Sequence, residues 1–235
     1  MPENSTANKE SNIKVTKNGP YIVTGKPPLM NMTIECDDEG TTPSKWDIGE
    51  KIKTPEIYAL CRCGQSNNKP FCDGSHIKAN FDGTEVSDNE PFEQMAKEID
   101  GPELKLKDAE ILCASARFCH RGGDIWDVIH RTNEAEAKQN VIENSCDCPS
   151  GRLVVVDKKT GETIEPPMEK SIGVVHDPSK EVDGPLWVRG GIPICSANGK
   201  LYEVRNRVTL CRCGKSTNKP FCDSSHYPEE EDRER

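Results

Sequence analysis

Long apolar segments and aromatic side chains are scarce in this 235-residue chain. Hydrophobic residues make up 33% and aromatic residues 5% of it. No stretch approaches the roughly 20 apolar residues of a membrane span, and no apolar signal core follows Met1. The first arginine is Arg62, which argues against a mitochondrial transit peptide. We therefore expect a cytoplasmic protein that has no membrane partner.

Basic residues are outnumbered by acidic ones, with 31 Lys and Arg against 40 Asp and Glu. The formal net charge is −9, and the chain ends in an acidic run at residues 229–232, so we expect no nucleic-acid partner. We find no glycine-rich phosphate loop, nucleophile elbow or carboxylate pair, and so we do not expect an enzyme. Because the apolar core is thin for this length, metal centres are expected to contribute to folding.

Cysteine is plentiful, and part of it is repeated. The 12 cysteines include those of two 17-residue copies, Leu60 to His76 and Leu210 to His226, which differ at three positions. We call residues 60–76 the first motif and residues 210–226 the second motif. Both keep the spacing C-x-C-x8-C-x3-H, which predicts two equivalent metal sites. The candidate ligands are Cys61, Cys63, Cys72, His76, Cys211, Cys213, Cys222 and His226.

The spacing bears on which metal is bound. Three thiolates and one imidazole also suit zinc, but zinc fingers usually place two or more residues between paired cysteines. Here only Arg62 separates Cys61 from Cys63. A dinuclear cluster, with two cysteines on one iron and a cysteine and histidine on the other, suits this spacing better. The residues favour iron–sulfur and leave zinc open.

The stretch from Cys61 to His76, Cys-x-Cys-x8-Cys-Asp-Gly-Ser-His, resembles the signature of the CDGSH (NEET, or mitoNEET-like) iron–sulfur family. The resemblance implies a 2Fe–2S cluster held by three cysteines and one histidine in each motif, acting in electron transfer or cluster transfer. The second motif departs from it, with Ser224 in place of glycine. Single-motif relatives form homodimers. Two motifs in one chain therefore imply a monomer whose halves pair internally about a pseudo-two-fold axis.

The duplication extends upstream of the ligands. Residues 19–25 parallel residues 184–190, and the first half carries about 15 extra residues around Cys36 to Trp46, which we predict to be a surface loop. A strand is expected to lead into each motif, at residues 57–60 and 202–210. Asp73 and Asp223 stand where they would cap a helix that runs through the ligand histidine.

Between the motifs lies a different segment, residues 91–177, which we call the insert. Apolar spacing predicts a helix over residues 92–99 and another near residues 125–129. Asn133 can cap a third helix, which runs from Glu134 towards Asn144. Residues 153–156 are β-branched and apolar, which predicts a strand.

Four cysteines lie in the insert. Cys113-x5-Cys119 followed by Cys148-Pro149 resembles a divergent single-cluster ferredoxin, whose middle ligand would fall at Ala116. Cys146 could complete a four-cysteine site for a 4Fe–4S cluster, or three cysteines could hold a 3Fe–4S cluster. The alternative is a retained fold in which Cys113 and Cys119 only fill space.

These observations predict an α+β protein: a small mixed β-fold built from two CDGSH half-modules, plus a ferredoxin-like α/β insert. The expected divisions are a disordered tail at 1–12, modules at 13–90 and 178–227 around the insert at 91–177, and an acidic tail at 228–235. The expected partner is a redox or cluster-acceptor protein. The alternatives are a zinc-binding structural or interaction module and a redox- and pH-sensing regulatory subunit.

Overall fold

The computed structural model describes residues 10–87 and 89–228 and has an α+β fold. The strands are β1 (Asn12–Val15), β2 (Tyr21–Thr24), β3 (Leu29–Cys36), β4 (Pro43–Ile52), β5 (Tyr58–Leu60), β6 (Lys97–Asp100), β7 (Leu104–Asp108), β8 (Leu153–Asp157), β9 (Thr163–Ile164), β10 (Ser171–Asp177), β11 (Val182–Arg189), β12 (Ile194–Cys195) and β13 (Arg207–Leu210). The helices are α1 (Ser75–Lys78), α2 (Phe92–Met95), α3 (Ile125–Val128) and α4 (Ala135–Asp147), with 3-10 turns η1 (Glu110–Leu112), η2 (Phe118–His120), η3 (Ile129–Arg131) and η4 (Pro178–Lys180). Most of both predicted tails lies outside the described residues, and Asn12 already belongs to β1.

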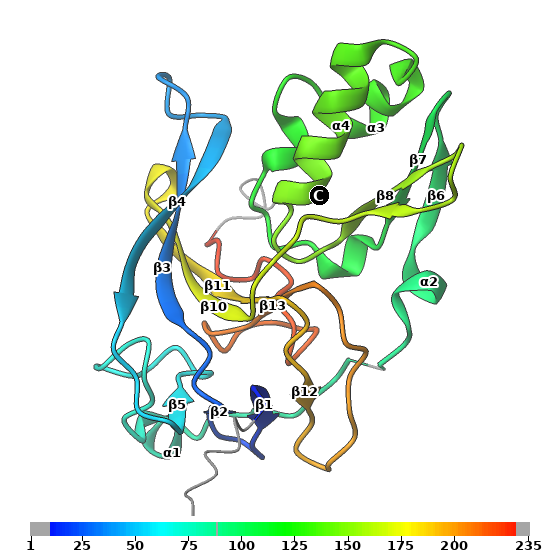
Figure 1. Cartoon of the computed structure of the whole chain (residues 1–235). Coiled ribbons are helices and arrows are strands. Elements are labelled where there is room, and N and C mark those ends of the chain that lie inside the picture. Colours follow the sequence, from blue (N-terminus) through cyan, green and yellow to red (C-terminus); the bar gives the residue numbers. More distant parts are fainter. Residues whose placement is uncertain (1–9, 88, 229–235) are drawn as a thin grey trace, which may run out of the picture.

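Two of the three sheets exchange strands between the halves of the chain (Figure 1). Their orders are β12-β1-β2-β5 and β13-β11-β10-β3-β4. β3 follows β2 in sequence but pairs in parallel with β10, whereas β12 follows β11 and pairs in parallel with β1. The antiparallel registers also correspond: Tyr21 is opposite Leu60 in one sheet, and Leu186 is opposite Leu210 in the other. Each sheet therefore contains strands from both halves.

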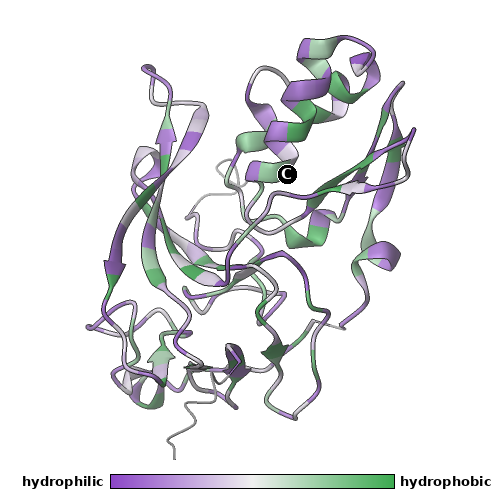
Figure 2. Cartoon of the chain, viewed as in Figure 1, coloured by the Kyte–Doolittle hydropathy of each residue, from purple (hydrophilic) through white to green (hydrophobic). Residues whose placement is uncertain are grey.

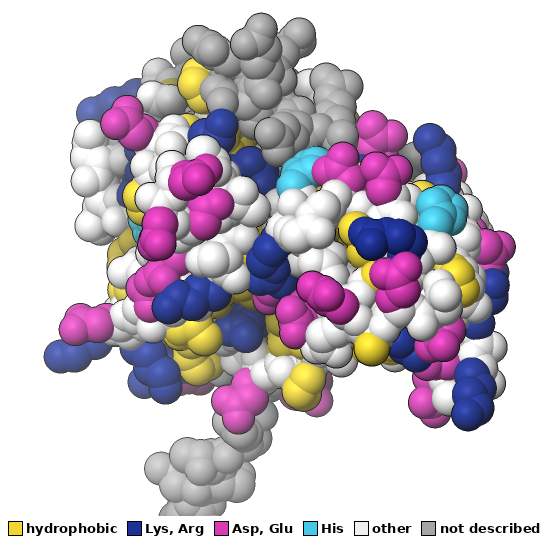
Figure 3. All heavy atoms as spheres, turned by 90° about the horizontal axis from the view of Figure 1, so that it is seen from above, with side chains coloured by type: hydrophobic (Ala, Val, Ile, Leu, Met, Phe, Trp, Pro, Cys, Tyr) yellow, Lys and Arg dark blue, Asp and Glu magenta, His cyan; other side chains and the backbone are white. Residues whose placement is uncertain are grey.

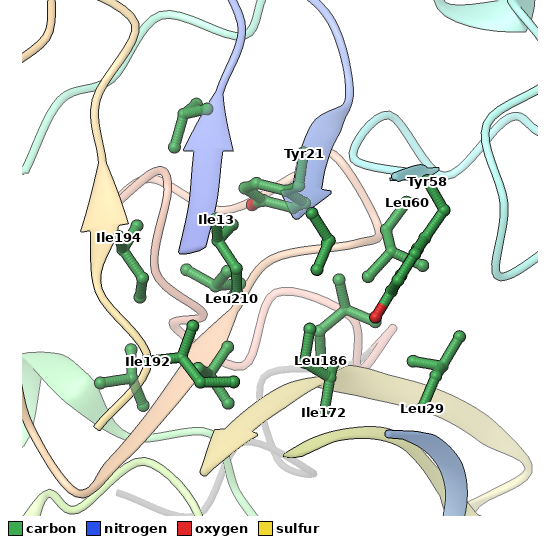
Figure 4. Packing of buried hydrophobic residues seen from close by; sticks show 14 of the residues in the cluster. Ile13, Tyr21, Leu29, Tyr58, Leu60, Ile172, Leu186, Ile192, Ile194 and Leu210 are labelled. Carbon is green, nitrogen blue, oxygen red and sulfur yellow. The ribbon is translucent and has the colours of Figure 1, made fainter. Parts of the chain in front are cut away.

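A shared core lies between these two sheets (Figure 4). Ile13 and Leu60 from one sheet pack with Ile172 and Leu186 from the other, and all four are buried. Burying an aliphatic side chain of this size is worth about 1.5–3 kcal/mol relative to leaving it in water. Because the two halves contribute similar numbers of residues to one core, neither half encloses a complete core by itself.

The extra residues of the first half do not form the predicted surface loop. They form the long hairpin of β3 and β4, with Thr33 opposite Asp47 and Ile34 opposite Trp46. Met32 and Ile34 of β3 are buried against Trp187 and Phe118. Apolar and polar residues alternate over residues 30–34, as they do in a strand with one buried face. This alternation favours a strand, although the residues at the tip of the hairpin are polar.

The insert forms a third sheet, in the order β6-β7-β8-β9, against which α3 and α4 pack. Leu106 and Val155 from the sheet meet Ile125 of α3 and Val141 of α4. Figure 2 marks apolar residues on both α4 and the strands beside it. The expected strand at residues 153–156 is present as β8, and the helix expected near residues 125–129 is present as α3 followed by η3.

Two helix boundaries differ from the predictions. The helix predicted over residues 92–99 ends at Met95, and Ile99 lies in β6 opposite Leu106. In β6, the backbone N–H and C=O groups of residues 97–100 can form hydrogen bonds with β7. A short helix would leave many of these groups without hydrogen-bond partners. The third helix begins at Ala135 after Glu134, with no side-chain cap from Asn133.

The end of the predicted insert pairs outside it. β10 lies between β3 and β11 in the five-stranded sheet, where Ile172 is opposite both Leu29 and Val188. Its burial pattern is almost continuous, as expected for a central strand covered on both faces. Hydrogen bonding thus joins residues 171–177 to the two halves that carry the motifs.

Candidate metal centres

The first motif brings its four candidate ligands together as two pairs. The Sγ atoms of Cys61 and Cys63 are 3.8 Å apart, and the Sγ atom of Cys72 lies 3.4 Å from Nδ1 of His76. Backbone pairing around Phe71 folds the loop back onto the end of β5. A tight polar loop therefore sets the spacing between the two pairs of ligands.

The second motif repeats this arrangement. The Sγ atoms of Cys211 and Cys213 are 3.6 Å apart, and the Sγ atom of Cys222 lies 3.5 Å from Nδ1 of His226. The loop returns to β13 through a bridge between residues 210 and 221, as it does between residues 60 and 71 in the first motif. The Lys69–Pro70 and Lys219–Pro220 peptide bonds are both cis.

These separations fit two ligands on one metal ion. Tetrahedral bonds of about 2.3 Å to sulfur and about 2.0 Å to nitrogen hold two sulfurs about 3.8 Å apart, and a sulfur and a nitrogen about 3.5 Å apart. Among residues 10–87 and 89–228, no group of three or more His, Cys, Asp or Glu side chains is close enough to hold a single ion. Within each motif the candidate ligands therefore lie as two close pairs.

The helix predicted to pass through each histidine is reduced or missing. In the first motif α1 starts at Ser75, after Gly74 with φ of +88°, and in the second motif the equivalent residues form only a turn. Asp73 instead accepts hydrogen bonds from the backbone amides of Ser75 and Asn67, both at 2.9 Å. The Ser75 hydroxyl, followed by these two amides, lowers the pKa of the Asp73 carboxyl group. The aspartate closes the ligand loop rather than capping a long helix.

The two motifs touch each other at their second cysteines. Cys63 and Cys213 form an antiparallel β-bridge, and the glycines that follow them, Gly64 and Gly214, have φ of +74° and +82°. A Cβ atom on Gly64 would lie 2.5 Å from the carbonyl oxygen of Cys213, and one on Gly214 would lie 2.6 Å from that of Cys63. Only glycine permits this approach of the two backbones.

Three of the four insert cysteines converge. Cys113, Cys119 and Cys148 line one pocket, and Ala116 lines it too. Burial and the neighbouring Cys148 and Cys113 sulfurs raise the pKa of the Cys119 thiol. We call this the insert pocket. It presents three thiols, with an alanine at the position of the missing fourth ligand.

The fourth insert cysteine does not line this pocket. Cys146 lies near the end of α4, where burial raises the pKa of its thiol and the nearby Arg207 guanidinium opposes that rise. Two residues along an α-helix turn by about 200°, so Cys146 cannot face the same way as Cys148, which caps the helix end. The four-cysteine site that included Cys146 is therefore not assembled in this structure.

Comparison with protein-family models identifies both parts of the chain. The family described as "Iron-binding zinc finger CDGSH type" matches residues 18–77 and 183–227. The family described as "Divergent 4Fe-4S mono-cluster" matches residues 99–158. The chain is a tandem CDGSH protein with an inserted mono-cluster segment. It is accordingly an iron–sulfur protein. Comparison with curated proteins and with solved structures found no match.

Each CDGSH motif also contains a buried arginine that sequence analysis did not single out. The Arg62 guanidinium donates to the carbonyl oxygens of Thr16, at 3.2 Å, and Gly83, at 2.7 Å. Arg212 donates to those of Gly184, at 2.6 Å, and Val175, at 2.8 Å. In the sequence, these two arginines could have been recognised by their position between the paired cysteines of both motifs. Each arginine ties its motif to flanking backbone, and the Arg212 guanidinium is close enough to interact with the Cys61 and Cys213 thiols.

Burial at the CDGSH sites works against charged sulfur. It raises the pKa of the Cys63 thiol and raises that of Cys222 well above its ordinary value. A bound cation reverses this preference, because it stabilises the thiolate directly. Binding of a metal ion at these sites would therefore release the thiol protons.

Figure 3 shows acidic and basic side chains interspersed over one face of the molecule. In the part of the chain that the structure describes, no helix combines the length and the apolar character needed to cross a membrane.

Proposed function

We propose that the chain binds two 2Fe–2S clusters, one in each CDGSH motif, and that it carries electrons or clusters to a partner. Cys61 and Cys63 would hold one iron of the first cluster, and Cys72 and His76 the other. The ligands of the second cluster would be Cys211, Cys213, Cys222 and His226. A 2Fe–2S cluster, when bound, supplies one-electron redox chemistry.

One observation carries this proposal: each motif offers two separated ligand pairs. Zinc in a closed structural site takes all four ligands around one ion. The pair separations of 3.8 and 3.4 Å, and of 3.6 and 3.5 Å, fit two ligands on one ion, and among the described residues no third such side chain joins either pair. This pattern supports a dinuclear cluster over the alternative of a zinc-binding structural module.

The protein's own charges support the same assignment. Three thiolates and a neutral imidazole leave an oxidised 2Fe–2S site with a net charge of about −1. Arg62 and Arg212 lie within the motifs and are 1% and 6% exposed. A buried guanidinium beside a negatively charged site offsets part of the cost of enclosing that charge.

The corresponding strand pairs support an internal pseudo-two-fold relation between the two halves, and hence a monomer. β1, β2 and β5 would correspond to β10, β11 and β13, and the exchanged strands β12 and β3 to each other. The proposed partner is a redox or cluster-acceptor protein. We propose a carrier role rather than catalysis of a substrate reaction, in the cytoplasm.

A third cluster is proposed for the insert pocket, with Cys113, Cys119 and Cys148 as its ligands. A cubane-type cluster separates its ligand sulfurs more widely than a single ion does, so a pocket lined by three thiols suits it. With Ala116 in place of the fourth ligand, the choice is between a 3Fe–4S cluster and a 4Fe–4S cluster that has one iron without a cysteine.

The decisive experiment is the visible absorption spectrum of anaerobically purified protein, with iron, zinc and sulfide counted per chain. A coloured protein with about four irons and four sulfides supports two 2Fe–2S sites, and additional iron and sulfide supports the third cluster. A colourless protein that carries about two zinc ions would overturn the redox proposal and leave a structural zinc module.

A further inference from the structure

The two CDGSH motifs are almost identical in sequence but are covered differently. Cys222 is 2% exposed, whereas its counterpart Cys72 is half-buried. The residue after each histidine differs most: Tyr227 is 1% exposed, and Ile77 is 72% exposed. α1 of the first motif buries no side chain at all. The difference must come from what packs against the second motif.

A buried polar cluster from the insert holds Tyr227. Its hydroxyl accepts a hydrogen bond from Nη1 of Arg117 at 2.8 Å and lies 2.6 Å from Oδ2 of Asp177, to which it donates. Arg117 and Asp177 form a buried ion pair at 2.5 Å. Arg117 stands between Ala116 and Cys119, both of which line the insert pocket. One guanidinium thus connects the insert pocket to the residue that follows His226.

The loop of the second motif has a further contact with the insert. Nδ2 of Asn218 donates to the carbonyl oxygen of Ile111 at 3.2 Å, two residues before Cys113. Asn218 is 7% exposed, whereas Asn68 at the same position of the first motif is exposed. Cys113 itself lines a surface pocket together with Asn218.

Arg207 ties the other side of the insert pocket to the strand that leads into the second motif. Its Nη1 donates to the carbonyl oxygen of Cys148 at 2.7 Å, its Nη2 pairs with Glu165 at 2.6 Å, and it is 1% exposed. It lies in β13, four residues before Cys211. The second motif is therefore held to the insert at its entry, its loop and its end.

From this asymmetry we propose that the two CDGSH sites have different roles: the first releases its cluster to an acceptor, and the second retains its cluster. This inference rests on the proposed 2Fe–2S function. The acceptor is a protein with a metal-free cysteine ligand set. In the transfer, the cluster exchanges three Fe–S(Cys) bonds and one Fe–N(His) bond for bonds to the acceptor. When the acceptor binds through four cysteines, three of the four protons that its thiols release pass to the freed thiolates and the fourth passes to solvent or the freed imidazole, and no net electron moves.

Tyr227 and Arg117 are positioning residues in this scheme. They do not ligate metal; they hold the segment that carries His226 against the insert, so that its ligands cannot open. Ile77, at the equivalent position of the first motif, is exposed and does not anchor that segment. Opening the first motif at α1 uncovers no buried side chain of that helix, whereas opening the second at Tyr227 breaks the hydrogen bonds of its hydroxyl to the buried Arg117–Asp177 pair.

The test mixes the anaerobic, cluster-loaded full chain with excess metal-free 2Fe–2S ferredoxin. Samples are quenched with N-ethylmaleimide at intervals, and alkylation of Cys72 and Cys222 is measured by peptide mass spectrometry. We expect Cys72 to become reactive at least five times faster than Cys222. Equal rates, or faster reaction of Cys222, would overturn the assignment of roles. A protein in which neither motif carries iron before mixing would instead overturn the proposed function.

Tyr227→Phe tests the positioning residues, with Ile77→Ala as the matched control. Tyr227→Phe should accelerate the reaction of Cys222 several-fold and leave that of Cys72 unchanged, whereas Ile77→Ala should leave Cys222 unchanged. General loss of stability would accelerate both cysteines, so their ratio separates the two explanations. Arg117→Lys keeps the charge and should have a smaller effect in the same direction. An unchanged ratio in Tyr227→Phe would contradict the role of Tyr227.

Discussion

The hydroxyl of Tyr21 lies 2.8 Å from the carbonyl oxygen of Cys211, a residue 190 positions further along the chain. It also lies 3.0 Å from the carbonyl oxygen of Pro220. A side chain of the first half thus joins both ends of the ligand loop in the second half. The corresponding position in β11 is Leu186, which has no hydroxyl to offer the first motif.

Replacing Tyr21 by phenylalanine should weaken the second site. The change leaves two buried carbonyl oxygens without this donor, which lowers the free energy of unfolding by about 1–3 kcal/mol. Denaturant unfolding measures this cost, and visible absorption measures cluster retention. Tyr58→Phe is the control, because the Tyr58 hydroxyl donates to Pro27, away from the ligands. Equal cluster loss in the two variants would contradict the assignment.

Gly64→Ala should separate the two motifs. Its Cβ atom would lie 2.5 Å from the carbonyl oxygen of Cys213, and its φ is already +74°. Gly40→Ala is the control, because Gly40 has φ of +70° with no atom within 4 Å of the added carbon. The positive φ costs about 1 kcal/mol in both variants, and the clash adds about 1–3 kcal/mol in Gly64→Ala alone. Denaturant midpoints that coincide would count against this contact.

Two serine substitutions distinguish the role of Cys148 from that of Cys146 in the insert. Cys148→Ser removes a thiol from the insert pocket and should remove the iron and sulfide that exceed those of the two CDGSH motifs. Cys146→Ser should leave the iron count unchanged, because Cys146 does not line the pocket. Iron and sulfide analysis of both proteins decides the question. Iron loss in Cys146→Ser would show that Cys146 is a ligand after all.

His76→Cys should lower the reduction potential of the first CDGSH site. A thiolate in place of a neutral imidazole adds one negative charge to the cluster, which disfavours the added electron. A redox titration followed by visible absorption measures the shift, and His226→Cys should produce the same change at the second site. An unchanged potential in His76→Cys would mean that His76 is not a ligand.

Asp177 should make stability depend on pH in the acid range. Burial alone would raise the pKa of its carboxyl group, but hydrogen bonds from Arg117 and Tyr227 and the Arg117 charge lower it below its ordinary value. A depressed pKa in the folded state stabilises the protein above about pH 4, and this contribution is lost as the pH falls through the folded-state pKa.

The comparison variant for this pH effect is Asp177→Asn. It leaves the buried Arg117 guanidinium without its counter-charge and should lower the free energy of unfolding at neutral pH by about 3–5 kcal/mol. Between pH 5 and pH 3, about one unit either side of an ordinary Asp pKa, the stability of the variant should fall less than that of the wild type. Parallel pH profiles from thermal unfolding would contradict the pKa direction.

Sequence patterns were reliable where they acted over short distances. The repeat predicted two four-residue ligand sets, and the structure places Cys61 with Cys63 and Cys72 with His76. A strand at residues 153–156 was also predicted, because β-branched residues between turns have a local preference that packing reinforces. The hairpin of β3 and β4 (residues 29–52) was not predicted, because the local sequence does not show which distant side chains β3 packs against.

The chain by itself determined the ligand types, their spacing and the duplication, because a few intervening residues limit how far two ligands can separate. Only the tertiary structure decided that Cys148 lines the insert pocket and Cys146 does not, since the end of α4 turns them in different directions. It also decided that Tyr227 is buried while Ile77 is exposed. Two nearly identical motifs acquire different surroundings because long-range packing places the insert beside one of them.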